Sequence, residues 1–168
     1  NACFETGFRN PIDEAIRAHS KFDIGAYKKL DEVPYDFSRK RLSILVSKEG
    51  VNVMVTKGAL VNVLSVCSHA RVSGGATADI ESVRGEIEGR FAGLSSEGFR
   101  VLGVASRSGI GESLITKDFE KDMTFLGFIT LFDPPKEGVK GTIDELERLG
   151  IELKVVTGDS REVALHVS

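Results

Sequence analysis

Residues 36–41, with the sequence DFSRKR, place one aromatic ring beside three basic side chains. A ring such as that of Phe37 can stack on a nucleotide base, and the guanidinium groups of Arg39 and Arg41 can bind phosphate. This composition suits a phosphorylated ligand that carries a base. A solvated basic turn with one core phenylalanine accounts for the same residues, so this segment alone does not separate the two interpretations.

A second candidate follows at Lys57-Gly58-Ala59, where a predicted strand passes into a predicted helix. Lys57 can direct a charge into a cleft, and Gly58 permits close approach of backbone or ligand. The helix N-terminus adds partial positive charge. An ordinary strand-to-helix turn with an exposed lysine is the alternative.

Two further stretches carry polar side chains at the ends of apolar runs. Arg100 precedes one such run, where an exposed arginine at a strand start is the plain interpretation. The segment VVTGDS at 155–160 ends a buried run with a hydroxyl, a glycine and a carboxylate. Ligand groups gather at the carboxyl ends of strands in open α/β sheets, so Thr157 and Asp159 could contact a phosphoryl group or its Mg²⁺. A glycine turn with a capping residue explains the same segment.

The elements that would position these residues can be predicted from local patterns. Asn10 followed by Pro11 predicts a capped helix start. Two β-rich runs, 42–46 and 51–55, flank the turn 47–50 and predict a hairpin. The remaining expected elements are helices over 59–68 and 79–94, strands over 101–105 and 123–132, and a mobile loop over 106–118.

Pro134 and Pro135 separate two patterns along the chain. The part before them predicts an α/β domain with a mixed, largely antiparallel twisted sheet flanked by helices. The part after them predicts a helix over 136–149 and a strand over 151–156, which is the alternating order of elements in a parallel α/β domain. We therefore expect one domain over 1–132, a stiff proline connector, and a partial second domain over 133–168.

Composition limits the class of partner. The formal net charge of −3 provides no basic field for nucleic acid, while 41% hydrophobic and 28% charged residues are ordinary for a globular domain. No apolar run approaches the ~20 residues that span a bilayer. Cys3 and Cys67 show no pairing pattern, and the histidines have no metal-ligand spacing, so we expect a reducing setting and no metal site.

The order of the candidate motifs resembles that of the P-type cation-transporting ATPases over nearly the whole chain. The motifs are FSR at 37–39, KGA at 57–59, FR at 99–100, DPPK at 133–136 and TGD at 157–159. The forms KGAL and DPPKE, with TG at 6–7 and NPID at 10–13, look most like the bacterial magnesium-transporting subgroup.

This resemblance implies the nucleotide-binding (N) domain, followed by the hinge and part of the haloacid-dehalogenase-like phosphorylation domain. It implies that Phe37 stacks on adenine, while Lys57 and Gly58 lie deep in the adenosine pocket. Asp13 matches an acid near the adenine edge. The arginines Arg39 and Arg100 match cations near the phosphates.

Thr157, Gly158 and Asp159 match the loop that helps hold the phosphoryl group and Mg²⁺. The implied ligands are ATP and the Mg²⁺ that arrives with it. The implied partners are the phosphorylation and actuator domains of one parent chain, a cation transporter, expected to carry Mg²⁺, in a bacterial inner or plasma membrane. The chain itself would be a cytoplasmic part, not inserted in the bilayer.

The sequence DKTGT, which carries the phosphorylated aspartate in that family, is absent from this chain. Without that nucleophile no aspartyl-phosphate can form. We therefore expect the chain to bind ATP weakly, with a dissociation constant of roughly 0.1 to several mM, and not to hydrolyse it. Leu42 stands where many calcium and sodium pumps carry a lysine, which removes one cation from the site.

Two other functions remain open from the sequence. The α/β pattern near Thr157 is also found in phosphatases of the haloacid-dehalogenase type, although no Asp-x-Asp nucleophile motif opens such a domain here. A ligand-free regulatory or docking domain could use the basic residues 39–41 to bind an acidic partner.

Overall fold

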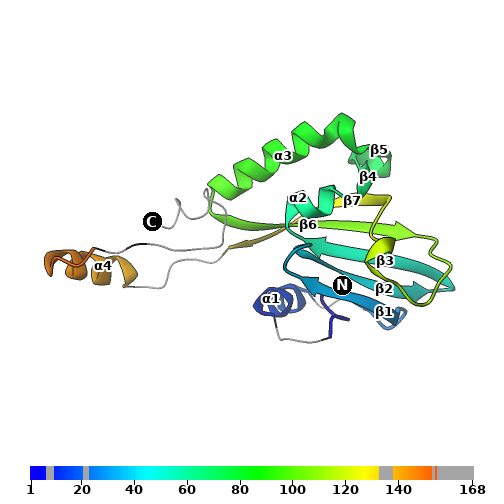
Figure 1. Cartoon of the computed structure of the whole chain (residues 1–168), viewed down its shortest axis with the longest axis horizontal. Coiled ribbons are helices and arrows are strands. Elements are labelled where there is room, and N and C mark those ends of the chain that lie inside the picture. Colours follow the sequence, from blue (N-terminus) through cyan, green and yellow to red (C-terminus); the bar gives the residue numbers. More distant parts are fainter. Residues whose placement is uncertain (7–9, 21–22, 133–137, 153, 155–168) are drawn as a thin grey trace. The chain divides into compact units, whose positions relative to one another are not determined.

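Apolar runs form the central strands of a mixed sheet in the computed structural model of this chain, which describes residues 1–6, 10–20, 23–132, 138–152 and 154. Figure 1 shows the arrangement of its helices and strands. The elements are α1 (Pro11–His19), β1 (Lys28–Asp36), β2 (Arg41–Lys48), β3 (Val51–Gly58), α2 (Leu60–Leu64), β4 (Cys67–Arg71), the short helix η1 (Ser73–Gly75), β5 (Thr77–Asp79), α3 (Ile80–Ser96), β6 (Phe99–Ser108), the short helix η2 (Lys117–Phe119), β7 (Met123–Phe132) and α4 (Val139–Arg148).

The strands form one seven-stranded sheet in the order β1-β2-β3-β6-β7-β4-β5. The pairs β1–β2, β2–β3, β3–β6 and β4–β5 are antiparallel, whereas β4 and β7 are parallel. The prediction of a mixed, largely antiparallel sheet with flanking helices is confirmed.

The β2–β3 hairpin forms where the sequence predicts it. Arg41 pairs with Gly58 at one end and Lys48 with Val51 at the other. Glu49 and Gly50 have φ of 52° and 80°. Positive φ at both turn residues matches the right-handed twist of the strands, and glycine adopts it without steric cost.

Helix α1 begins as its sequence predicts. The side-chain oxygen of Asn10 accepts a hydrogen bond of 3.0 Å from the backbone N–H of Ile12, and Pro11 occupies the first turn. A proline is tolerated there because the first helical N–H groups have no intrahelical partner. The cap fixes the helix that carries Asp13.

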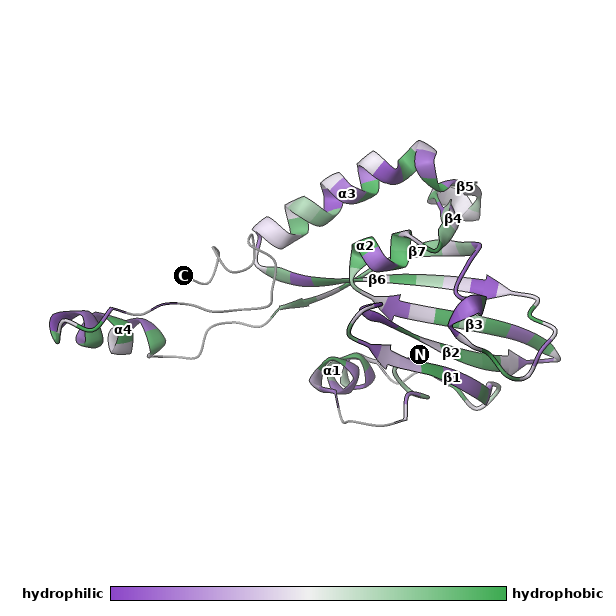
Figure 2. Cartoon of the chain, viewed as in Figure 1, coloured by the Kyte–Doolittle hydropathy of each residue, from purple (hydrophilic) through white to green (hydrophobic). Residues whose placement is uncertain are grey.

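Strand β2 is buried on both faces, which divides the adjoining sheet into two environments. Leu42, Ile44 and Val46 form an apolar cluster on one face, packed by Phe4 and Val53. On the other face Ser43 and Thr56 are fully buried. The hydropathy colouring in Figure 2 shows hydrophobic stretches, interrupted by polar residues, along β2, β3 and β6.

The structure differs from the sequence predictions at one helix and one strand. The helix expected over 59–68 ends at Leu64, because Cys67 enters β4 and pairs with Met123 of β7. Strand β1 is absent from the predictions, since its edge position requires no apolar alternation. Helix α3 extends over 80–96 despite three internal glycines, close to its predicted range.

The chain divides into two compact units, residues 1–86 with 102–129 and residues 87–101 with 130–168. The second unit includes α4 and an aromatic contact between Phe99 and Phe132, with ring centroids 5.7 Å apart. The domain boundary expected after residue 132 stays a prediction, and Pro134 and Pro135 lie outside the described residues. Among the described helices, none is long and apolar enough to cross a bilayer.

Candidate functional site

The turn between β1 and β2 is fixed by the side chain of Asp36. Its Oδ1 accepts hydrogen bonds from the backbone N–H of Ser38 at 2.8 Å and of Arg39 at 2.9 Å, and from the Ser38 hydroxyl. The hydroxyl bond, followed by the Arg39 amide bond, lowers the pKa of Asp36 below its ordinary value. The N–H of Lys40 bonds to the Asp36 carbonyl at 2.7 Å, which closes the turn.

This turn presents the ring of Phe37 to solvent. The residue is 87% exposed, the largest exposed fraction among the exposed apolar residues of the described chain. Its ring contacts the ring of Tyr35 edge-on, with centroids 5.4 Å apart and an interplanar angle of 89°. An exposed aromatic ring on a hydrogen-bonded turn leaves a ring face open for stacking.

The same turn lies beside the end of β3. The carbonyl oxygen of Lys40 accepts a hydrogen bond of 2.9 Å from the N–H of Ala59. A Cβ placed on Gly58 would lie 2.3 Å from that carbonyl oxygen and 2.7 Å from the Cα of Arg41. Glycine is therefore required at 58 by the neighbouring backbone. The structure brings the predicted motifs 37–39 and 57–59 together.

Lys57 belongs to the opposite side of the sheet from Ser43 and Thr56, opposite Leu42 in the β2–β3 register. It is 4% exposed, and its Nζ forms an ion pair of 2.8 Å with Glu5 and a closer one with Asp13. Its charge is therefore already matched by carboxylates from the N-terminal segment and α1.

The carboxylates around Lys57 are not fully satisfied. Asp13 is 2% exposed, and its Oδ2 has no hydrogen-bond partner among the described residues. Burial raises the pKa of Glu5, and the hydrogen bond with Asp13 raises it further, while Lys57 opposes both. A buried carboxylate oxygen without a hydrogen-bond partner is energetically costly.

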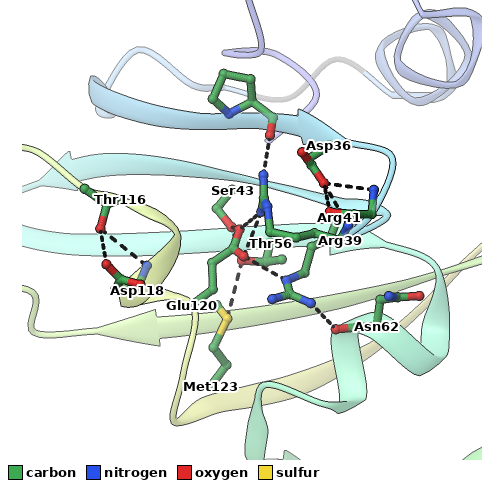
Figure 3. A network of polar contacts seen from close by, with 12 residues as sticks. Asp36, Arg39, Arg41, Ser43, Thr56, Asn62, Thr116, Asp118, Glu120 and Met123 are labelled. Atoms are coloured by element: carbon green, nitrogen blue, oxygen red, sulfur yellow. Dashed lines mark hydrogen bonds and ion pairs between the residues drawn. The ribbon is translucent and has the colours of Figure 1, made fainter.

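On the other face of the sheet, Arg39 binds a carboxylate that the sequence analysis did not identify. Its Nη1 donates to both oxygens of Glu120, at 2.7 and 2.8 Å. Arg41 Nε and the Ser43 hydroxyl donate to the same carboxylate at 2.8 and 2.7 Å, and Ser43 also contacts Thr56 at 2.6 Å (Figure 3). In the sequence, the one local sign of this network is that Ser43 and Thr56 are polar residues within otherwise apolar strands.

The remaining predicted residues belong to the second compact unit, lie outside the described residues or form part of the core. Arg100 is exposed on β6 and belongs to the second compact unit. Thr157, Gly158 and Asp159 lie outside the described residues. Leu42 is 2% exposed and contributes to the apolar cluster, so this position is part of the core rather than of a cationic surface.

The predicted site residues of the described chain belong to no metal-binding group and do not line the cavity near the end of β6. Within the described ranges, no group of three or more His, Cys, Asp or Glu side chains is placed to hold a metal ion. A cavity of about 280 Å³ lies near the end of β6, between Arg107 and Lys121. It contains none of the predicted site residues, and its lining mixes both charges without a buried ligand-facing group.

Comparison with known proteins gives consistent matches. Residues 15–138 match the family described as P-type ATPase, cytoplasmic domain N. Magnesium-transporting ATPase, P-type 1, of Salmonella typhimurium and that of Escherichia coli K12 are each 32% identical over 174 residues, covering 99% of this chain and 19% of theirs. Calcium-transporting ATPase 3, endoplasmic reticulum-type, of Arabidopsis thaliana is 32% identical over 141 residues, covering 82% of this chain and 14% of its own.

The chain thus spans about a fifth of the length of the magnesium-transporting relatives. The resemblance inferred from the motifs is confirmed, including the match to magnesium-transporting proteins over nearly the whole chain.

Proposed function

Because the chain belongs to the P-type ATPases, as their cytoplasmic domain N, we propose that it binds ATP and presents the γ-phosphate to a phosphorylation domain. Phe37 stacks on the adenine ring. Lys57 and Asp13 lie at the inner end of the adenosine site, with Gly58 allowing the turn to close against β3. Mg²⁺ arrives on the phosphates of ATP rather than at a site of its own.

The observation that carries this proposal is the exposed ring of Phe37, held on a hydrogen-bonded turn that is bonded to the end of β3 at Ala59. A base stacked on Phe37 would cover a ring that is 87% exposed. The unpartnered Oδ2 of Asp13, on helix α1, offers a further acceptor.

The charges nearest the site fit a base more closely than a triphosphate. Lys57 is paired with Glu5 and Asp13, and Arg39 is paired with Glu120. By the family resemblance, Arg39 and Arg100 lie on the phosphate side, with Arg39 held on Glu120, and Thr157, Gly158 and Asp159 help hold the phosphoryl group and Mg²⁺. Because Arg39 and Lys57 are paired with carboxylates, we expect ATP to bind with a dissociation constant in the millimolar range.

In the parent protein the domain would serve an ATP-driven cation transporter, with Mg²⁺ as the proposed cargo by analogy with the magnesium-transporting relatives. The phosphorylation and actuator domains of the same chain would be its partners. The isolated chain would bind ATP without hydrolysing it, because phosphoryl transfer requires the aspartate that this sequence lacks.

Titration of the isotope-labelled chain with ATP tests the proposal. We expect amide chemical-shift changes concentrated at 36–40 and 57–59, and no phosphate release above a heat-inactivated control. Shifts confined to other surfaces, or none, would refute the site. Sustained phosphate release would refute the predicted lack of hydrolysis.

The alternative of a docking domain that binds an acidic partner through residues 39–41 is weakened by the same contacts. Arg39 and Arg41 already bind a buried carboxylate. An acidic partner would have to compete with Glu120, whose side chain is fully buried.

A further inference from the structure

Glu120 and Arg39 connect the core of the sheet to the turn that presents Phe37. We propose that Glu120 is a positioning residue for base binding, and that Arg39 acts mainly by fixing this turn through Glu120 rather than by binding phosphate. This inference rests on the proposed nucleotide-binding function and deepens it.

The carboxylate of Glu120 is a fixed anchor. Its side chain is fully buried, and three side chains donate to its two oxygens: Arg39, Arg41 and Ser43. Burial of a carboxylate is tolerated only when it is paired and hydrogen-bonded. Arg41 is itself held by the Asn62 carbonyl at 2.9 Å, so the anchor is tied to α2 as well.

Arg39 connects Glu120 to the turn. Its guanidinium binds Glu120 through Nη1 and the carbonyl oxygen of Pro34 through Nη2, at 2.7 Å. Its backbone N–H bonds to Asp36. Arg39 therefore connects the chain on both sides of Phe37, because its guanidinium binds the carbonyl of Pro34. The same guanidinium ties this turn to Glu120, 81 positions further along the sequence.

A role for Arg39 as a primary phosphate ligand conflicts with these contacts. A phosphate that captured Nη1 would leave Glu120 buried with one donor fewer, which is strongly unfavourable. If the guanidinium stays on Glu120, it does not have to be rearranged when a ligand binds. It also holds the turn, and with it the aromatic ring, in place. Preorganisation of this kind improves affinity by reducing what must be ordered on binding.

Binding of adenosine and of ATP to two variants separates the roles. Arg39→Lys keeps the positive charge but lacks the planar group that spans Glu120 and Pro34. Glu120→Gln keeps the shape but cannot accept from every donor. We expect both variants to bind adenosine about 2- to 12-fold more weakly, the range for one side chain that must be ordered on binding.

The exposed Glu112, in the loop before η2, provides the matched control, because Glu112→Gln makes the same chemical change away from the turn. We expect its adenosine affinity to equal that of the wild type. Without ligand, hydrogen exchange at the amides of 38–40 should be faster in Arg39→Lys and Glu120→Gln, while the β2–β3 amides stay protected. A general loss of stability would instead speed exchange throughout.

Adenosine affinity within twofold of wild type in a folded Arg39→Lys variant would overturn the inference. So would a variant that loses ATP affinity but keeps adenosine affinity, because that pattern identifies Arg39 as a phosphate ligand. If Glu120→Gln does not fold, Arg39→Lys still decides, since it leaves Arg41 and Ser43 on the carboxylate. A wild-type chain that binds neither ligand would refute the nucleotide proposal itself, and the role of Glu120 in binding with it.

Discussion

Phe37→Ala provides the sharpest test of the base-binding site, because the ring contributes much to binding and little to the fold. The ring is 87% exposed, and its recorded aromatic partner is Tyr35. Loss of an edge-on aromatic contact costs at most ~0.5–1.5 kcal/mol, and less for an exposed pair. The free energy of unfolding should therefore fall by no more than about 1 kcal/mol.

The effect on binding should be larger. Stacking of a base on an aromatic side chain is worth ~1–3 kcal/mol, which corresponds to an increase in the dissociation constant of about 5- to 160-fold. The assay is amide chemical-shift titration with ATP and with adenosine, at constant ionic strength. Both ligands should weaken by a similar factor, because the lost contact is with the base.

Leu114→Ala is a suitable control, since Leu114 is another exposed apolar residue of the same compact unit, 72% exposed. It should change neither stability nor affinity by a measurable amount. Unchanged ATP binding by a folded Phe37→Ala variant would refute the stacking pose. A loss for ATP with none for adenosine would show that the ring acts near the phosphates.

Three further predictions concern Gly58, Cys67 and Glu32. Gly58→Ala should lower the free energy of unfolding by ~1–3 kcal/mol in urea denaturation, because its Cβ would meet the Lys40 carbonyl oxygen at 2.3 Å; a variant of full stability would contradict this contact. Burial raises the pKa of Cys67 to about 12, so iodoacetamide at mildly alkaline pH should modify Cys3 first, as followed by mass spectrometry, and prompt labelling of folded Cys67 would contradict its burial. The stability that this thiol contributes is complete below its unfolded pKa of about 8.5 and is lost as the pH rises toward 12. Burial alone would raise the pKa of Glu32, but hydrogen bonds from Lys29 and Thr6 hold it below the ordinary value, so its contribution is present above about pH 4.3 and is lost as the pH falls through the lower, folded pKa. Glu32→Gln should flatten this part of the acid dependence of the urea midpoint, and an unchanged profile would refute the assignment.

Local patterns predict the elements whose signals are complete within a short window. The N-cap of Asn10, the hairpin turn at Glu49 and Gly50, and the ten-residue apolar strand β7 depend on neighbouring residues alone. Their positions follow from capping, turn geometry and apolar composition.

Elements defined by distant partners are missed for a physical reason. Cys67 continues a helical spacing from Leu60, yet it becomes a strand because β7 pairs with it. The partner of Arg39 is Glu120, and no local pattern connects them. The motif order therefore identifies the turn with Phe37, but not the carboxylate that holds it.

Parallel pairing of β4 with β7 constrains the order in which this chain can fold. The β2–β3 hairpin needs only residues 41–58, whereas the contact of Cys67 with Met123 closes a long loop that includes α3 and β6. Closing such a loop has an entropic cost that must be met before the contact forms, so non-local pairings are usually late. During synthesis, β4 leaves the ribosome well before β7, its parallel neighbour, and cannot pair with it until then. Nascent chains stalled before Met123 should thus protect the hairpin from hydrogen exchange, but not β4.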